Sequence, residues 1–151
     1  MSFAGTISSY NSYILSFDAK MSSWIVDSGA SDHMTGKFQL LHNITKLNKP
    51  ILVSLPYGSL KVVTHKGIIK LTNDIILLDV LIIPDFKQNL LSVGSLLKNN
   101  DLQIVFFEHE CWFKFLSSNQ ILAKGWKKDG LYRFTQGEIQ NSGKDKLSQD
   151  S

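Results

Sequence analysis

The chain has 151 residues, which is enough for one ordinary domain and too few for two well-buried ones. Hydrophobic residues make up 43% and aromatic residues 11%, as in soluble globular proteins, and no apolar run reaches the roughly 18 residues that would predict a membrane span. The formal net charge of +3 comes from charges scattered along the sequence, so we predict no direct binding of nucleic acid and no membrane partner.

Cysteine and histidine argue against a disulfide and against a metal site. Cys111 is the single cysteine, which excludes an internal disulfide and is compatible with a reducing compartment. The four histidines follow no zinc-ligand spacing, and the pair His109 and Cys111 has no second pair to complete a site. We therefore predict neither a metal nor another cofactor.

Both ends of the chain are polar. Residues 1–21 are rich in Ser, Asn and small residues, and the first twenty lack the apolar stretch of a secretion signal. Residues 135–151 hold almost nothing that could be buried. We expect a flexible segment at 1–21, an ordered domain at 22–134 and a disordered polar tail at 135–151.

The first predicted strand, at 24–26, runs directly into Asp27. A carboxylate at the end of a core strand is costly to bury unless partners hold it or its function requires it. Ser28 can donate a hydrogen bond, and Gly29 lets backbone N–H groups approach the carboxylate closely. The sequence Asp-Ser-Gly is also ordinary turn chemistry, so these residues alone leave both interpretations open.

A hairpin is predicted next. Residues 51–55 alternate apolar and polar, and a second strand at 60–64 follows a turn in which Pro56 presets the backbone and Gly58 tolerates positive φ. Residues 75–83 are so continuously apolar that we expect a strand buried on both faces.

After Pro84 the apolar spacing becomes helical. One side of a short helix, closed by Asn99 and Asn100, would comprise Leu90, Leu91, Val93, Leu96 and Leu97. Four more strands are predicted at 102–107, 111–116, 121–125 and 131–134. Alternation on these strands predicts that their aromatic residues are mainly core residues and not a stacking platform for bases; they include Phe106, Phe107, Trp112, Phe113, Phe115 and Trp126.

The predicted fold class is all-β. Eight or nine short strands with one short helix are most simply arranged as a small closed or nearly closed β-barrel.

Two separated motifs together resemble a known family. The first is "WIVDSGASDHMT", from Trp24, and the second is "VLIIPDFKQNLLSV", from Val80, with the hairpin between them. The first resembles the active-site loop of retropepsin-type aspartic proteases. The pair resembles the protease region of copia-type retrotransposon Pol polyproteins, over roughly Ser22 to Phe134.

The resemblance implies an aspartic endopeptidase that cleaves the Gag-Pol polyprotein in the cytoplasm. Asp27 would be the catalytic carboxylate, with Gly29 supporting it and Ser28 forming a hydrogen bond beneath it across a dimer axis. The tip of the flap over the bound peptide would comprise Pro56, Tyr57, Gly58 and Ser59.

A second copy of the chain would be required for this activity. An aspartic protease uses two carboxylates that share one proton, and this chain has a single Asp-Ser-Gly. We therefore expect a symmetric homodimer in which each subunit contributes Asp27, with activity favoured at mildly acidic pH.

Departures from the retroviral pattern keep alternatives open. Ser31 and Gln88 stand where retroviral enzymes carry an acid and an arginine that pair, which leaves the bracing of the dimer undetermined. A catalytically inactive β-barrel, retained as a relic or an interaction module, fits the same residues. A serine hydrolase using Ser28 or Ser31 is disfavoured, because no Gly-x-Ser-x-Gly exists and His33 would point awkwardly for a general base.

Overall fold

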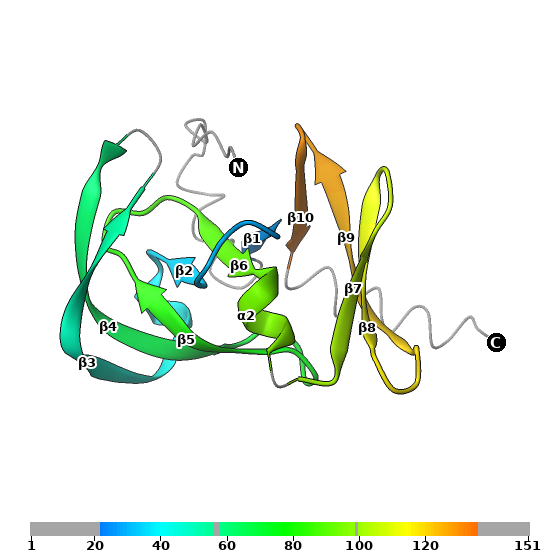
Figure 1. Cartoon of the computed structure of the whole chain (residues 1–151), viewed down its shortest axis with the longest axis horizontal. Helices are drawn as coiled ribbons and strands as arrows, with labels where there is room; N and C mark the ends of the chain where they lie inside the picture. Colours follow the sequence, from blue (N-terminus) through cyan, green and yellow to red (C-terminus); the bar gives the residue numbers. More distant parts are fainter. Residues whose placement is uncertain (1–21, 56–57, 99, 136–151) are drawn as a thin grey trace.

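Ten strands form one mixed sheet in the computed structural model, which describes residues 22–55, 58–98 and 100–135 (Figure 1). The predicted flexible segment at 1–21 and the predicted tail after Thr135 lie outside the described residues. The strands are β1 (Ser23–Asp27), β2 (Met34–Thr35), β3 (His42–Ser54), β4 (Leu60–Lys70), β5 (Ile76–Ile82), β6 (Asn89–Ser92), β7 (Leu102–Phe106), β8 (Glu110–Phe115), β9 (Ile121–Lys128) and β10 (Leu131–Thr135). The helical elements are η1 (Phe38–Leu40) and α2 (Val93–Leu97).

The order of the strands places β1 inside the sheet. The order is β3-β4-β5-β2-β6-β1-β10-β9-β8-β7. The pairs β1–β6 and β2–β5 are parallel, and the other neighbours are antiparallel. Figure 1 shows β3, β4 and β5 at one side and β7 to β10 at the other, with β1, β2, β6 and α2 between them.

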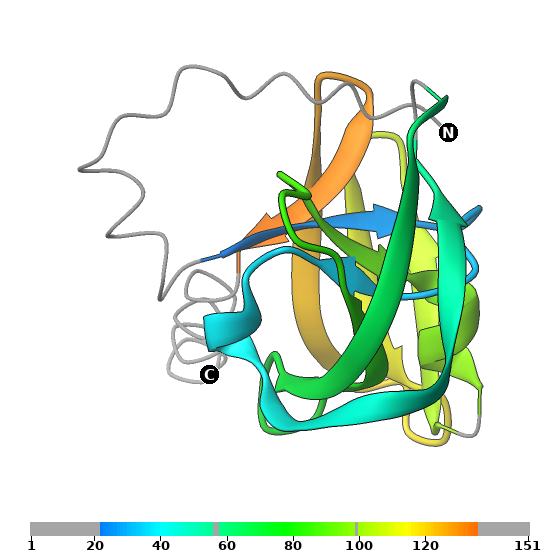
Figure 2. The ribbon, with the colours of Figure 1, turned by 90° about the vertical axis from the view of Figure 1, so that its left-hand side faces the viewer.

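The prediction of an all-β domain with one short helix is confirmed as a mostly β fold, whereas of the predicted closed or nearly closed β-barrel the closure is wrong. Strands β3 and β7 are the two edges of the sheet, and among the described residues they do not pair with each other. Figure 2, viewed from the β3–β4 side, shows how strongly the sheet coils without closing. Alternation along a strand reveals that a strand exists, but closure depends on tilt and stagger between strands, which the pattern does not encode.

The predicted hairpin is present as β3 and β4. Leu52 lies opposite Val62 in the antiparallel register. Strand β3 begins at His42, nine residues before the predicted start at Ile51. The prediction missed these residues because the register of β3 with β4 shifts twice, which hides the alternation of apolar and polar residues. Pro50 is tolerated there, since β3 is an edge strand and needs no ladder donor on its open side.

The predicted burial of both faces at 75–83 is wrong. Leu77 and Val80 are fully buried, whereas Ile76 is 42% and Leu78 is 56% exposed. Asp79 has a φ of 55°, and the register with β4 shifts near this residue. Such a bulge turns the strand, so its solvent-facing side chains no longer follow a simple alternation.

The predicted helix is shorter than its apolar spacing suggested. Leu90 and Leu91 belong to β6, where they pair with Ile25 and Val26 of β1. Helix α2 begins after Ser92, whose hydroxyl accepts a hydrogen bond from the backbone N–H of Ser95. The C-cap of the helix is Lys98, and Asn100 does not adopt the left-handed conformation that its predicted role as a helix end required. Its side chain instead donates to the carbonyl of Leu96 at 2.6 Å, while Asn99 lies outside the described residues. Leu90 and Leu91 form a strand and not the first turn of the helix, because β6 pairs with the buried strand β1.

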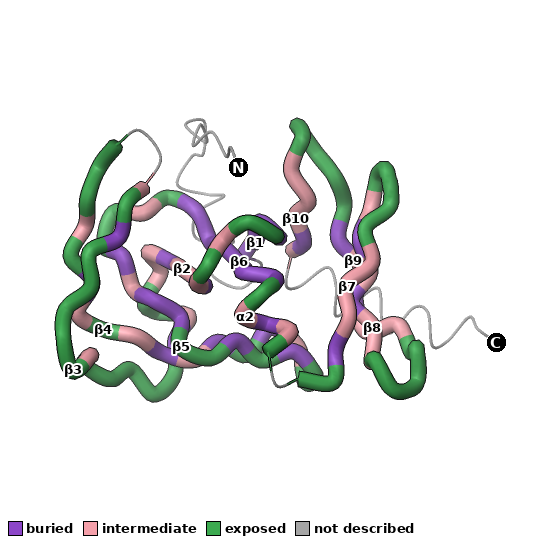
Figure 3. The backbone as a smooth tube through the Cα atoms, in the orientation of Figure 1, coloured by how far each residue is buried: buried purple, intermediate pink, exposed green. Residues whose placement is uncertain are grey.

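The main core joins both halves of the sheet (Figure 3). Trp24 of β1 packs in one cluster with Phe113 of β8 and Phe134 of β10, and each is at most 1% exposed. The prediction that the aromatic residues of the C-terminal strands lie in the core is correct for Phe113. It is wrong for Phe106, Phe107 and Trp126, whose side chains are exposed. No helix in the described part of the chain is long and apolar enough to cross a membrane.

Gly36 is a position at which a side chain cannot fit. A Cβ there would collide with the backbone carbonyl oxygen of Phe86 and lie 3.1 Å from that of Ile83. We expect Gly36→Ala to lower the free energy of unfolding by about 1–3 kcal/mol, because backbone atoms must move. Gly94→Ala is the matched control: it lies on α2 with nothing within 4 Å and should stabilise by up to about 1 kcal/mol. Urea unfolding of both variants tests this, and equal midpoints would contradict it.

Candidate active site

Asp27 is the last residue of β1 and is almost enclosed by the fold. The strand carries it there because Trp24, Ile25 and Val26 are all buried, so the strand cannot shift without exposing them. β1 is flanked by β6 on one side and β10 on the other, and Asp27 lies opposite Ser92. Asp27 is only 7% exposed, while the next residues, Ser28 and Gly29, are exposed.

The two oxygens of the Asp27 carboxylate differ. Oδ1 accepts a hydrogen bond of 2.7 Å from the backbone N–H of Gly29, as the sequence predicted for this glycine. Oδ2 is buried and has no hydrogen-bond donor among the described residues. A buried oxygen without a donor costs roughly 1–3 kcal/mol relative to one that accepts a hydrogen bond.

Two serines hold the loop after Asp27 against β6 and α2. The Ser92 hydroxyl donates to the carbonyl oxygen of Ala30 at 2.7 Å, and the Ser95 hydroxyl donates to that of Ser31 at 2.9 Å. The loop is thus braced within one chain, although the ion pair of retroviral enzymes is absent at Ser31 and Gln88. The sequence analysis did not predict a role for Ser92 or Ser95 at the site. The sequence feature that could have pointed to Ser92 is its place as a serine at the start of the helix.

His33 lies in the interior beneath this loop and not over the turn as a surface loop residue. It is 2% exposed, and its Nδ1 accepts a hydrogen bond of 2.9 Å from the backbone N–H of Ser92. Burial lowers the pKa of His33 to about 4, with a smaller opposing effect of Asp32 and Asp79. His33 is therefore neutral at pH 7 and acts as an acceptor that positions Ser92.

The serine hydrolase alternative finds no support in this geometry. The Ser31 hydroxyl donates to the carboxylate of Asp32 at 3.0 Å, and Nδ1 of His33 is occupied by the Ser92 N–H. A serine nucleophile needs its hydroxyl bonded to a base, and His33 is not so placed.

A second buried polar contact joins the strands around β1. The Thr35 hydroxyl donates to Oδ1 of Asn89 at 2.6 Å, and Nδ2 of Asn89 donates to the carbonyl of Ser23 at 3.0 Å. Because Thr35 is on β2, Asn89 on β6 and Ser23 on β1, the contact fixes three strands behind the Asp27 loop.

A pocket of about 310 Å³ opens beside Asp27. One wall comes from β1 and its loop and comprises Ile25, Val26, Asp27 and Ser28. The other wall comes from the C-terminal strands and comprises Phe106, Gly130, Leu131 and Tyr132. The second wall was not predicted, because it lies about a hundred residues away in the sequence.

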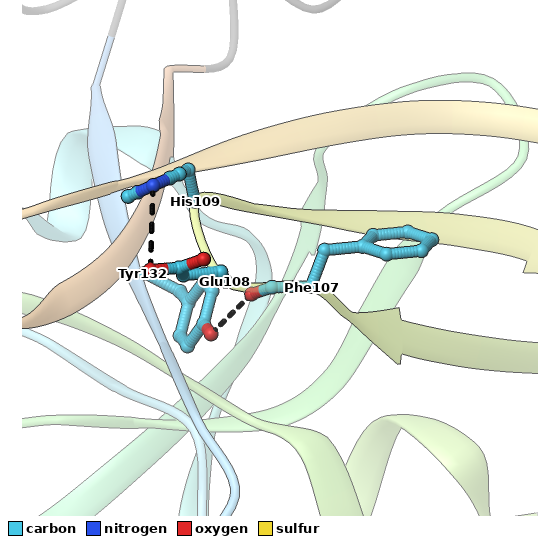
Figure 4. Close-up of polar contacts among 4 residues, drawn as sticks. All are labelled: Phe107, Glu108, His109 and Tyr132. Carbon is cyan, nitrogen blue, oxygen red and sulfur yellow. Dashed lines mark hydrogen bonds and ion pairs between the residues drawn. The ribbon is translucent and has the colours of Figure 1, made fainter.

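The Tyr132 side of the pocket is held in place by the β7–β8 turn (Figure 4). The Tyr132 hydroxyl donates to the carbonyl of Phe107 at 2.6 Å, and its ring meets the Phe106 ring edge-on with centroids 4.9 Å apart. In the same turn, Nε2 of His109 lies 3.6 Å from a carboxylate oxygen of the exposed Glu108. Phe106 and Tyr132 of the pocket lining are thus held in place by contacts within β7–β10.

The predicted flap coincides with the β3–β4 turn. Gly58 has a φ of 81°, and the turn is closed by hydrogen bonds from Gly58 N–H to the Leu55 carbonyl and from Leu55 N–H to the Ser59 carbonyl. Pro56 and Tyr57 lie outside the described residues. Gly58 and Ser59 are exposed and do not line the pocket at Asp27. Within the described ranges no three His, Cys, Asp or Glu side chains gather as metal ligands.

Comparison with known proteins places this geometry in context. The profile of a family described as "Pol polyprotein, beta-barrel domain" matches residues 24–101. The retrovirus-related Pol polyprotein from transposon RE2 of Arabidopsis thaliana is 32% identical over 114 residues, and that from transposon RE1 is 30% identical over 118. Each match covers 74% of this chain, and the chain spans 8% of the length of each relative. No solved structure matches the chain.

Stability should depend on pH through His33. The unfolded chain binds a proton at this residue near its ordinary pKa of 6.5, and the folded chain only near 4. The contribution of neutral His33 is therefore complete above pH 6.5 and is lost as the pH falls toward 4; at pH 5 the loss is about 2 kcal/mol.

His33→Asn separates this effect from general acid sensitivity. The amide oxygen can accept from the Ser92 N–H as Nδ1 does, and it does not titrate. Urea unfolding at pH 8, 6 and 5 should show a smaller loss for His33→Asn than for the wild type. Equal losses in the two proteins would rule out His33 as the source.

Proposed function

The chain belongs to the β-barrel domain family of the Pol polyproteins of copia-like retrotransposons, and from this premise we propose that it is one half of an aspartic endopeptidase. The observation that carries the proposal is the Asp27 carboxylate. One of its oxygens is fixed by the Gly29 N–H, and the other is buried without a donor at the edge of a pocket. A carboxylate held in one pose with a free oxygen is what a proton-sharing dyad requires.

The second carboxylate would come from a second copy of the chain. The sequence contains a single Asp-Ser-Gly, so a two-fold axis passing near Asp27 would bring the two Asp27 side chains together. The exposed residues Ser28 and Gly29 would lie at this axis. One carboxylate of the pair would activate a water molecule while the other donates its proton to the scissile carbonyl.

The substrate we propose is an extended peptide of the Gag-Pol polyprotein in the cytoplasm. Phe106, Leu131 and Tyr132 give the pocket an apolar wall, which suits a hydrophobic side chain next to the cleaved bond. The flap would comprise Pro56, Tyr57, Gly58 and Ser59. Its turn is stabilised by two backbone hydrogen bonds and would have to approach Asp27 when the peptide binds.

A non-catalytic domain is the second candidate. The family description names a β-barrel domain and no activity. The observation that favours this candidate is that β10 of the same chain already pairs with β1 and contributes a wall of the pocket beside Asp27. If that wall keeps a second copy away, the domain acts only as an interaction module of the polyprotein.

Asp27→Asn is the test of the peptidase. We expect cleavage of unfolded peptides, followed by mass spectrometry at pH 5 and pH 7, to fall by roughly 10²- to 10⁴-fold. The free energy of unfolding should stay equal or rise, because the variant removes a buried charge whose Oδ2 has no donor. Asp74→Asn makes the same change at an exposed turn residue and should leave cleavage unaltered.

Sedimentation of the same samples decides between the two candidates. A dimer that cleaves peptides and becomes silent with Asp27→Asn supports the endopeptidase. A folded monomer that cleaves nothing at either pH would overturn it in favour of the non-catalytic module. An active monomer would overturn the dyad between two copies.

A further inference from the structure

Strands β7 to β10 have one face that is packed and one that is not. On β8, the inward residues Cys111 and Phe113 are fully buried, and Gly125 and Ala123, which lie opposite them on β9, are buried as well. The alternate residues of β8, Glu110 and Trp112, point to the other side. There Trp112 lies opposite Lys124 of β9, and Glu110 lies opposite Trp126. None of these four outward residues is buried. We call this side the outer face.

The outer face presents aromatic rings at the surface. Trp126 is 51% exposed and Phe107 is 41% exposed. Trp112 is half-buried, and its ring centroid lies 4.8 Å from that of Phe107. Large exposed aromatic side chains on a sheet are unusual unless something packs on them.

Positive charges surround these rings. The strand register places four cationic side chains on the same side as these rings. They are Lys114, Lys124, Lys128 and Arg133. Lys124 places its Nζ 4.7 Å from the centroid of the Trp112 ring. None of the four forms an ion pair with a carboxylate in the described part of the chain. The one carboxylate in this register, that of Glu110, accepts a hydrogen bond of 3.0 Å from the Trp112 indole N–H.

The sequence did not reveal this combination. The cations are separated by up to nineteen positions, and the small net charge of +3 argued against a nucleic-acid partner. Antiparallel pairing of β8, β9 and β10 brings them onto one face, because alternate residues of paired strands share a side. The charge on one face, and not the total, decides which ligand can bind there.

We propose that the outer face of β7–β10 binds single-stranded nucleic acid. Exposed rings offer surfaces on which unpaired bases can stack, and cations beside them can bind the phosphates between the bases. A duplex would hide the faces of its bases from the rings. A second copy of the chain is a poor occupant, since it would bring four cations against four cations with little negative charge to offset them.

Fluorescence anisotropy with labelled oligo(dT) and oligo(U) of about 15 nucleotides, at several salt concentrations, tests the proposal. We expect Trp126→Ala to weaken binding at least about fivefold, the loss of one stacked base, and Trp126→Phe to weaken it less. Lys124→Gln with Lys128→Gln should reduce the slope of log affinity against log salt by about 1.4, since each phosphate contact contributes about 0.7.

Matched controls lie at the other end of the sheet. Phe38→Ala removes a ring that is 63% exposed on η1, and Lys46→Gln with Lys49→Gln removes two exposed charges of β3. These variants should bind both oligonucleotides like the wild type. Circular dichroism would establish that every variant is folded.

Four outcomes would overturn the proposal. They are no binding at low salt, equal weakening by the control variants, unchanged binding of Trp126→Ala, and equally tight binding of a duplex of the same length. A dimer that dissociates with Trp126→Ala and binds no oligonucleotide would assign the face to a contact between copies instead.

Discussion

The parallel pairing of β1 with β6 is the constraint on which the candidate site depends. It sets Asp27 opposite Ser92, so that the loop leaving β1 meets the start of α2. Ser92 then makes three contacts at once: its N–H donates to His33, its hydroxyl donates to Ala30, and the same hydroxyl accepts from Ser95. A shift of one residue in this register would turn the buried residues of β1 outward and break all three contacts.

With the proposed dyad, the same arrangement would place opposing requirements on the site with respect to pH. Neutral His33 is an acceptor buried beneath the loop, and protons destabilise it because its charged form is poorly solvated there. A dyad that shares one proton works best when some acid is present. Strain of this kind between stability and function is common around active sites.

The C-terminal strands are more than an extension of the domain. The family profile ends at residue 101, yet β10 pairs with β1 and provides Leu131 and Tyr132 to the pocket beside Asp27. The face of these strands that points into the protein completes the main core with Phe113 and Phe134. Their other face carries aromatic and basic side chains that the core does not need. Strands β7 to β10 thus contribute both to the pocket beside Asp27 and to the outer face.

The sequence by itself determined the local features of this protein. Asp27 at the end of an apolar strand, the Gly29 N–H on its carboxylate, the hairpin of β3 and β4 and the mostly β class follow from alternation and turn residues that act over a few positions. Only the tertiary structure decided that the sheet stays open, that Leu90 and Leu91 form a strand, that His33 is buried and that Tyr132 lines the pocket beside Asp27. Each of these depends on which strands become neighbours, and contacts between residues sixty to a hundred positions apart leave no periodic trace in either segment.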